Sequence, residues 1–294
     1  GEYSENLEID KNVTLLGPGS DAENQATING DCDIHVSVNA SNVTVSGFTL
    51  TDDFCNNANI VYIGSAMDNV TISDNIIPDG DTGIWVNNST NVTITDNQIS
   101  GNYYGIYLIG DVSGGLITGN TIINNASAGI SSGGGTTFTE LDILENGITN
   151  TGDGYGIYFD QVVNSPESLT ISGNTISENG NGGIYINFVQ NSTISITDNP
   201  ANSNNGGVGV AICGEGECFN STLAVLGNAI EDNQGPGLQI YDLFSSSLSV
   251  EGNTVSGNNF GWGEAGFELW YVGSEEEEAS TVTVSGNVFD GNFR

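Results

Sequence analysis

A short segment that alternates apolar and polar residues and closes on Asn recurs along the whole chain. Its clearest copies are VTISDN (70–75), VTITDN (92–97), LTISGN (169–174), ISITDN (194–199), LAVLGN (223–228), LSVEGN (248–253) and VTVSGN (282–287). With looser copies included, the closing Asn falls at positions 75, 97, 120, 146, 174, 199, 228, 253 and 287. Internal repetition with a period of this order is typical of a solenoid, in which each repeat packs only on its neighbours.

A second segment, of the form Gly-apolar-X-apolar, follows each closing Asn by about ten residues. Examples are GIWV (83–86), GIYL (105–108), GIYF (156–159), GIYI (183–186), GLQI (237–240) and GFEL (266–269). Both segments alternate with a period of two, so we expect each to be a strand with one buried face. Because no helical pattern separates them, the sequence predicts a parallel β-helix of about eleven coils, on the order of 50 Å long at ~4.8 Å per coil.

The alternation also predicts which side chains enter the core. In VTISDNII (70–77) we expect Val70, Ile72 and Ile76 to point inward, and Thr71 and Ser73 to point outward. The closing Asn suits the bend, because Asn tolerates the left-handed backbone region and bonds its own backbone. Stacked copies predict a ladder of Asn side chains that satisfies buried turn amides.

This repeat, together with the opening GEYSENLEIDKNVTLLGPG (1–19), resembles the right-handed parallel β-helix of the pectate-lyase-like superfamily, which includes NosD-type repeat proteins. The resemblance covers essentially the whole chain and implies an all-β, single-stranded β-helix with residues 1–294 as one domain; the handedness comes from the resemblance alone. Relative to that family, both end coils look incomplete, and we expect an excerpt of a longer protein. The fold hosts many activities, so the resemblance is specific for fold and weak for function.

Charge excludes two classes of partner. The chain carries 37 Asp and Glu against two cationic side chains, Lys11 and Arg294, which gives a formal net charge of −35. It therefore has no basic patch for nucleic acid, and an anionic membrane surface would repel it. Apolar runs are too short to span a bilayer.

Disulfides between the four cysteines would imply an oxidising compartment, extracellular or periplasmic, and we expect the protein outside the cell or at the cell surface. Cys32 and Cys55 lie at similar places in adjacent coils, and Cys213 and Cys218 flank the short loop CGEGEC, so we expect disulfides, although four cysteines allow three pairings. The sequons are at Asn12, Asn39, Asn42, Asn69, Asn87, Asn88, Asn91, Asn125, Asn191 and Asn220. They predict glycosylation, although Asn and Thr are also the ordinary turn and strand residues of such a repeat.

The absence of cations argues against lyase or epimerase chemistry on polyuronates, which the superfamily resemblance would otherwise suggest. No Lys or Arg lies between residues 12 and 293 to bind substrate carboxylates or to stabilise an enolate. Copper handling of the NosD type has little support either, since the chain has one Met, Met67, and one His, His35. A glycoside hydrolase would need two carboxyls, for which Asp160, Asp242 and Glu268 are the weak candidates.

One sheet is expected to carry aromatic residues on its outer face. The X of Gly-apolar-X-apolar should face solvent, and by this count the column includes His35 and Val61 near its start. With the residues two positions later, the candidates for ligand binding are Trp85, Tyr107, Tyr158, Tyr185, Tyr241 and Trp270. Exposed aromatic rings in a row can stack on sugar rings or pack against a partner.

The acidic run Glu275, Glu276, Glu277 and Glu278 lies in the coil that departs most from the repeat. Carboxylates are the ligands that Ca²⁺ prefers, so loose calcium binding is an expectation here, beside a solvated surface loop; no cofactor is required.

Two functional hypotheses follow. The first is a non-catalytic extracellular β-helix with a structural or adhesive role, which associates end to end with neighbouring copies of itself. The second is a carbohydrate-active module that binds, or hydrolyses, a polysaccharide on its aromatic face. They differ in whether the protein releases product from a glycan.

Overall fold

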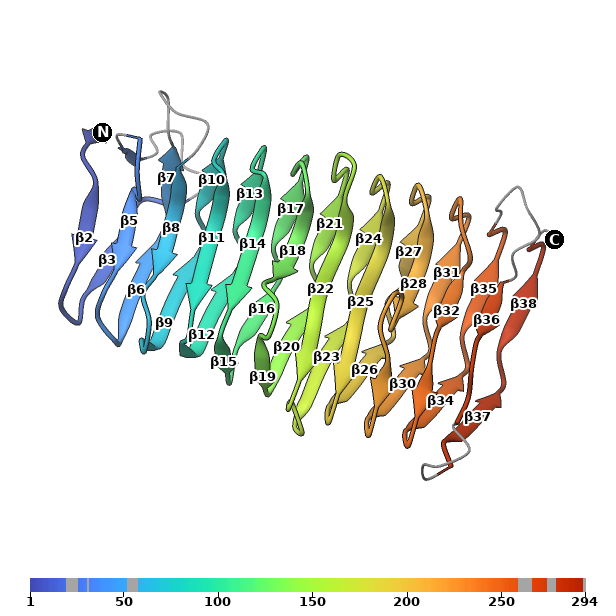
Figure 1. The fold of residues 1–294 in the computed structure, drawn as a ribbon. Coiled ribbons are helices and arrows are strands. Elements are labelled where there is room, and N and C mark those ends of the chain that lie inside the picture. The colour runs from blue at the N-terminus through green and yellow to red at the C-terminus, as the bar shows by residue number, and fades with distance from the viewer. Residues whose placement is uncertain (20–25, 31, 52–57, 259–265, 274–278, 293–294) are drawn as a thin grey trace.

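The computed structural model describes residues 1–19, 26–30, 32–51, 58–258, 266–273 and 279–292. Throughout these residues the regular structure is β-strand, and no helix occurs among them. Each coil contributes one strand to each of three parallel sheets, here called sheets A, B and C (Figure 1). The predicted all-β, single-stranded right-handed parallel β-helix is confirmed.

Sheet A contains β1 (Glu2–Ser4), β4 (Ala26–Asn29), β7 (Phe48–Thr51), β10 (Ile76–Pro78), β13 (Gln98–Ser100), β17 (Thr121–Ile123), β21 (Gly147–Thr149), β24 (Thr175–Ser177), β27 (Ala201–Ser203), β31 (Ala229–Glu231), β35 (Thr254–Ser256) and β38 (Val288–Asp290). Sheet B contains β2 (Leu7–Ile9), β5 (Val36–Val38), β8 (Asn59–Ile63), β11 (Thr82–Asn87), β14 (Tyr104–Ile109), β18 (Ala128–Ser132), β22 (Tyr155–Val163), β25 (Gly182–Gln190), β28 (Val208–Ile212), β32 (Leu238–Ile240) and β36 (Phe267–Leu269). Sheet C contains β3 (Thr14–Leu16), β6 (Val43–Ser46), β9 (Asp68–Ser73), β12 (Thr90–Thr95), β16 (Leu116–Thr118), β20 (Leu141–Leu144), β23 (Ser168–Ser172), β26 (Thr193–Thr197), β30 (Thr222–Leu226), β34 (Ser247–Glu251) and β37 (Thr281–Ser285). Four short strands extend the bend between sheets B and C: β15 (Asp111–Ser113), β19 (Thr137–Thr139), β29 (Cys218–Phe219) and β33 (Leu243–Phe244).

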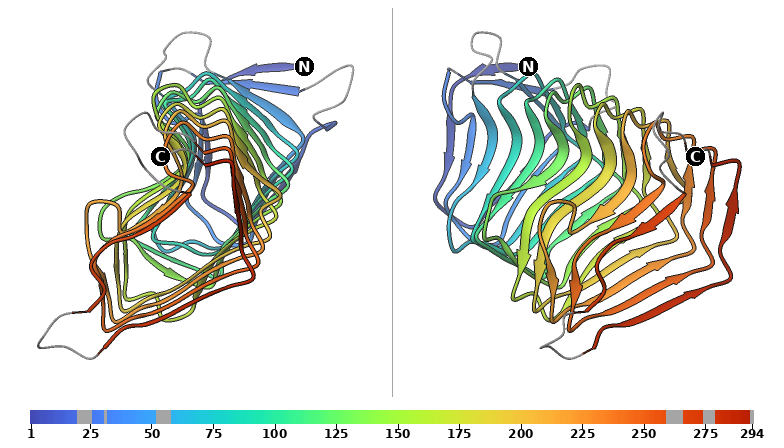
Figure 2. Two further views of the ribbon diagram at one scale, coloured as in Figure 1. Left: turned by 90° about the vertical axis from the view of Figure 1, so that its right-hand side faces the viewer. Right: turned by 45° about the vertical axis from the view of Figure 1, so that its right-hand side comes forward.

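Successive coils stack on one another, as the view along the rod shows (Figure 2). Val70 pairs with Val92 and Ile72 with Ile94, so the apolar columns of sheet C run in register. Burial of these columns supplies the main stabilisation, because each fully buried Val or Ile side chain contributes about 1.5–3 kcal/mol.

Sheet A corrects one sequence prediction. Ile77, not Ile76, is fully buried, because the closing Asn75 itself points inward and shifts the alternation by one residue. The short strands that follow each closing Asn form a sheet of their own. The two repeated segments of the sequence pattern did not predict this third sheet.

The predicted Asn ladder runs through the core at the bend between sheets C and A. Its members are Asn75, Asn97, Asn120, Asn146, Asn174, Asn199, Asn228, Asn253 and Asn287. Each donates its side-chain amide to the next member, and each closing Asn up to Asn253 is almost completely buried.

Two further ladders were not predicted. At the bend between sheets A and B, Asn102 donates to Asn125, and a second run continues through Asn179, Asn205, Asn233, Asn258 and Asn292. Thr151 stands between the two runs, and the side-chain amide nitrogen of Asn125 is buried without a partner. At the bend between sheets B and C, hydroxyls accept the backbone N–H groups of the preceding coil through Ser165, Ser192, Ser221, Ser246 and Ser280.

Candidate functional site

The outer face of sheet B carries the aromatic column, with one correction of register at its start. Trp85 pairs with Tyr62 on one side and with Tyr107 on the other. The position before them is Ser37, which pairs with Tyr62. The sequence pattern predicts His35 and Val61 on the outer face, but both are fully buried, because the first coils lack the Gly that precedes the strand in later copies.

The first aromatic group consists of Tyr62, Trp85, Tyr103, Tyr104 and Tyr107. The Trp85 ring lies 5.8 Å from that of Tyr62 and 5.6 Å from that of Tyr107, and it is nearly perpendicular to both. Tyr104 contacts Tyr107 at 5.1 Å and Tyr103 at 4.7 Å. The Tyr62 hydroxyl accepts a hydrogen bond of 2.9 Å from the Asn87 side chain. Edge-to-face contacts of this kind fix the rings and contribute about 0.5–1.5 kcal/mol each.

The central aromatic group consists of Tyr155, Tyr158 and Tyr185. The Tyr158 and Tyr185 rings are stacked with centroids 5.9 Å apart, and Tyr155 lies 4.7 Å from Tyr185. Glycine makes room for two of these rings, since a Cβ on Gly182 would lie 3.0 Å from the Tyr155 ring and one on Gly214 would lie 2.4 Å from the Tyr185 ring. Ser131 and Ala211, which flank this group in the same column, are small and buried.

The third group is Tyr241 with Trp270, whose ring centroids lie 6.1 Å apart. The Trp270 side chain is 49% exposed. Glu268 accepts hydrogen bonds from Gln239 at 3.1 Å and from the Trp270 indole at 3.5 Å. The six predicted aromatic residues therefore all lie on this face, joined by Tyr62, Tyr103, Tyr104 and Tyr155, which the sequence pattern missed.

The three candidate carboxyls do not form one cluster. Asp160 accepts hydrogen bonds from the Tyr158 hydroxyl at 3.5 Å and the Asn187 amide at 3.4 Å. Glu268 lies four coils further on, or ~19 Å along the rod, whereas glycosidase carboxyl pairs are about 5–9.5 Å apart. Asp242 is at a bend with φ 45°, three residues beyond Gln239, the register partner of Glu268.

Tyrosine acidity reflects the environment of this face. Burial, followed by the charge of Asp160 and neighbouring tyrosines, raises the pKa of Tyr107 and of Tyr158. Burial also raises the pKa of Tyr155 and Tyr185, with a further contribution from Glu215. These phenols are therefore neutral hydrogen-bonding groups at physiological pH.

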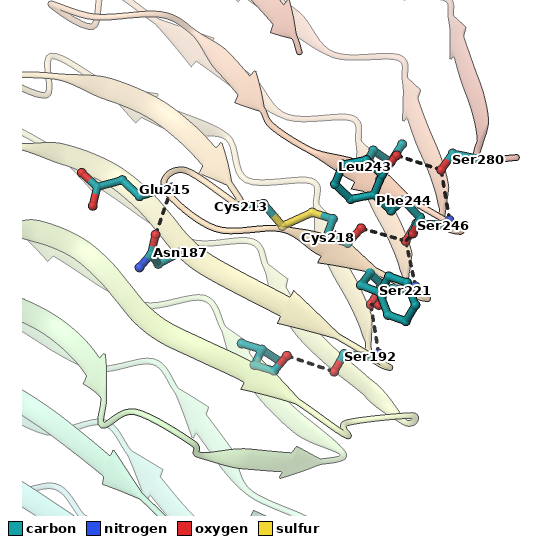
Figure 3. The surroundings of a disulfide bond; sticks show 12 residues. Asn187, Ser192, Cys213, Glu215, Cys218, Ser221, Leu243, Phe244, Ser246 and Ser280 are labelled. Carbon is teal, nitrogen blue, oxygen red and sulfur yellow. Dashed lines mark hydrogen bonds between the residues drawn. A yellow bond between two sulfur atoms is a disulfide. The ribbon is translucent and has the colours of Figure 1, made fainter. Parts of the chain in front are cut away.

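A disulfide closes the loop that carries Glu215 (Figure 3). This loop adjoins the central aromatic group, since a Cβ on its Gly214 would lie 2.4 Å from the Tyr185 ring. Cys213 and Cys218 are bonded to each other, as the loop CGEGEC suggested. The side-chain oxygen of Asn187 accepts the backbone N–H of Glu215 at 3.0 Å, which anchors the tip of the loop on sheet B. Cys32 is also disulfide-bonded; Cys55, its predicted partner, lies outside the described residues.

Four of the ten sequons occur at the same position of the repeat. Asn12, Asn42, Asn69 and Asn91 each begin the triplet Asn-Val-Thr and occupy equivalent positions at the bend between sheets B and C. The repeat itself explains the triplet: Asn42, Asn69 and Asn91 are left-handed, and in those coils the Val is buried and the Thr faces outward.

The other sequons are scattered around the same bend, with one exception. Asn191 and Asn220 form an outer ladder there with Asn164, at 3.1 and 2.8 Å. Asn39 and Asn88 are exposed and Asn87 is half-buried. Asn125 is fully buried in a core ladder, so the folded chain does not present it for glycosylation.

The donor atoms of the described residues do not fit copper, the metal that the NosD resemblance implies. Their His, Cys, Asp and Glu side chains include no group of three that could hold a metal ion. Copper favours thiolate, thioether or imidazole ligands; Cys32, Cys213 and Cys218 are oxidised and His35 is buried. The run Glu275–Glu278, suggested for Ca²⁺, lies outside the described residues.

Comparison with known proteins places the chain by family. The family described as "Periplasmic copper-binding protein (NosD)" matches residues 22–217, and "Right handed beta helix region" matches residues 145–294. No curated protein sequence matches the chain.

Among the described residues, no helix is long and apolar enough to cross a membrane.

Similar solved structures share the fold. They include DFA-IIIase from Arthrobacter chlorophenolicus A6 without its lid (TM-score 0.56, 13% identity, 97% of this chain and 80% of that one) and a periplasmic alginate epimerase AlgG mutant (0.54, 15%, 92% and 70%). A third is the Dettilon tailspike protein (0.53, 15%), where the match covers 96% of this chain and 60% of the tailspike chain. At such identities the likeness shows the fold alone. On the two family matches, the chain belongs to the NosD and right-handed β-helix families of repeat proteins.

Proposed function

We propose that the protein is a non-catalytic extracellular module that binds polysaccharide along the outer face of sheet B, in an adhesive role. The observation that carries this proposal is the arrangement of ten aromatic side chains in three groups on one face. Corresponding members of successive groups, such as Trp85, Tyr158 and Trp270, lie three or four coils apart, or ~14–19 Å. An extended polymer lying along the rod would meet all three groups in turn.

Polar groups beside the rings suit sugar hydroxyls. Asp160 and Asn187 border the central group, and Gln239 and Glu268 border the third group. Aromatic faces supply apolar contact, while carboxylate and amide groups fix orientation, which is the usual composition of a ligand site. Asp160 and Glu268 lie too far apart to act as one catalytic pair, and Asp242 lies at a bend, three residues beyond the register partner of Glu268. For these two reasons we propose binding without hydrolysis.

The test measures binding and product release together. Affinity electrophoresis through gels that contain individual neutral, acidic or amino polysaccharides should show retardation by at least one polymer, with no reducing ends released. The variants W85A and Y185A should each weaken retardation about tenfold, as expected for the loss of roughly 1–2 kcal/mol of ring contact. Tyr3→Ala is the matched control, since Tyr3 is exposed on sheet A. Release of reducing ends would refute the non-catalytic part, and equal retardation of all variants would refute the aromatic face as the site.

A further inference from the structure

The central aromatic group carries negative charge without a cation of its own. Asp160 accepts a hydrogen bond from Tyr158, and Glu215 follows Gly214, which lies against the Tyr185 ring. Glu215 acts electrostatically on all three phenols, and Asp160 acts on Tyr158. The only cationic side chain of Lys or Arg type among the described residues is Lys11, which lies in the first coil beside Asp10. A ligand that completes this site electrostatically would therefore be positively charged.

Hydrogen bonds hold the Asp160 carboxylate and the backbone of Glu215. Asp160, on β22, accepts hydrogen bonds from Tyr158 in the same strand and from Asn187 in the next coil. Glu215 belongs to the loop that the Cys213–Cys218 disulfide closes, and its backbone N–H donates to Asn187 (Figure 3). Asn187 thus bonds to both acidic residues, one through its nitrogen and one through its oxygen.

Rings and carboxylates together recognise an ammonium group. A cation over an aromatic ring gains about 0.5–2 kcal/mol, and an ammonium–carboxylate hydrogen bond is roughly twice as strong as a neutral one. Neutral sugars would use only the rings and hydroxyls here, and a polyuronate would be repelled by Asp160 and Glu215.

We propose that the Tyr155–Tyr158–Tyr185 group, with Asp160 and Glu215, is a subsite for a protonated amino group, so that the polysaccharide bound is one that contains free amino sugars. This inference rests on the proposed polysaccharide binding and specifies its ligand. A polymer of amino sugars is favoured over a basic peptide because the rings continue along the rod on either side of this subsite.

The experiment compares an oligomer of glucosamine with the same oligomer after N-acetylation, by calorimetry at pH 6 and fixed ionic strength. The free amine should bind about tenfold more tightly, which corresponds to ~1.4 kcal/mol. The variants D160N and E215Q should each weaken binding of the free amine more than binding of the acetylated oligomer, and so remove most of that difference. Asp142→Asn, the same loss of charge on the outer face of sheet C, should have no effect and controls for the overall charge of the protein.

Other outcomes separate this inference from the proposal beneath it. If the acetylated oligomer binds as tightly as the free amine, the subsite is refuted while polysaccharide binding stands. Tighter binding of oligolysine than of the glucosamine oligomer would refute the choice of an amino sugar. Monomeric glucosamine and N-acetylglucosamine, followed by tyrosine fluorescence, test the subsite even if no polymer binds: an amine-specific response that is lost in D160N supports it, and equal responses refute it.

Discussion

The side-chain oxygen of Asn120 accepts two hydrogen bonds from Asn97, one from its backbone N–H and one from its side-chain amide, both at 3.0 Å. The Asn120 amide in turn donates to Asn146 and to the backbone oxygens of Ile94 and Thr118. One buried amide thus links three coils.

We therefore expect Asn120→Leu to lower the free energy of unfolding by about 3 kcal/mol or more, because it leaves several buried backbone groups without partners. Chemical denaturation followed by circular dichroism measures the change. Asn181→Ala is the control, since Asn181 is exposed, and it should stay within about 0.5 kcal/mol of the wild type. Similar losses in both variants would show that the ladder adds little.

Thr151→Asn should stabilise the protein. Thr151 interrupts the ladder between Asn125 and Asn179, and it leaves the Asn125 amide buried without a partner. An Asn at this position supplies the missing acceptor, for a gain of about 1 kcal/mol. The measurement is the thermal midpoint of unfolding, and a lower midpoint would mean that the bond from the Thr151 hydroxyl to Gly154 matters more.

Two glycines should respond in opposite directions. A Cβ on Gly180 would lie 1.8 Å from the backbone oxygen of Gly152, whereas one on Gly147 meets nothing within 4 Å. Gly180→Ala is expected to lower the free energy of unfolding by about 3 kcal/mol, because the backbone at Gly152 must move. Gly147→Thr should raise the free energy of unfolding by about 0.5–1 kcal/mol, because the new Thr continues the outward column of Thr121 and Thr175. A lower midpoint of denaturation in Gly147→Thr would contradict the register of sheet A, in which Gly147 pairs with Thr121 and Thr175.

Glu140 gives a pH-dependent prediction. A hydrogen bond and repulsion with Glu167 raise the pKa of Glu140, so the folded state holds this proton to higher pH than the unfolded state. Stability from this group is present at low pH and is lost as pH rises through the raised pKa. Glu140→Gln should therefore raise the thermal midpoint at pH 7, and the difference should shrink as the pH falls to about 4.

Asp68 provides the control of opposite sign. Hydrogen bonds from Asn91 and Thr90 lower the pKa of Asp68, so its contribution is present at neutral pH and is lost on acidification. Asp68→Asn should thus lower the midpoint at pH 7. If both variants shift the midpoint in the same direction, general charge reduction is the cause.

Removal of the Cys213–Cys218 disulfide should have a local effect. The double variant Cys213→Ala, Cys218→Ala should have a free energy of unfolding about 2 kcal/mol lower, because the disulfide closes only a small ring. The loop that contacts Tyr185 and Asn187 is then less constrained, so chemical iodination of Tyr185 should accelerate. Tyr107, in the same column but remote from the loop, should iodinate at an unchanged rate. Equal acceleration at both tyrosines would indicate general loosening of the rod.

The repeat made the architecture predictable, because apolar alternation and a recurrent Asn leave few other folds. The inward orientation of the closing Asn was harder to predict. Because Asn75 points into the core, Ile77 rather than Ile76 is buried. The strand that contains Ile77 belongs to sheet A, which the alternation pattern did not separate from sheet C. The second Asn ladder was missed because its members follow strands of three residues, too short for periodicity to register.

The aromatic face was predictable in part. Trp85 and Tyr107 follow the Gly-apolar-X-apolar pattern, whereas Tyr62 was missed and His35 misplaced because the first coils lack the Gly that sets the register. Contacts such as that of Asn187 with Glu215 depend on a loop of the next coil, whose path the sequence did not specify.

The ladders give the rod a direction. In the first ladder, every amide from Asn75 to Asn253 donates to the Asn of the next coil, and in the second ladder every amide from Asn179 to Asn258 does so. The Asn-to-Asn bonds thus run in one direction, so that each side-chain carbonyl faces the preceding coil. Aligned amides polarise one another and their dipoles add, as peptide dipoles do in an α-helix. The core is thus electrically polar along its length, with its partial positive charge toward the last coil, although the apolar columns beside the ladders look the same in both directions.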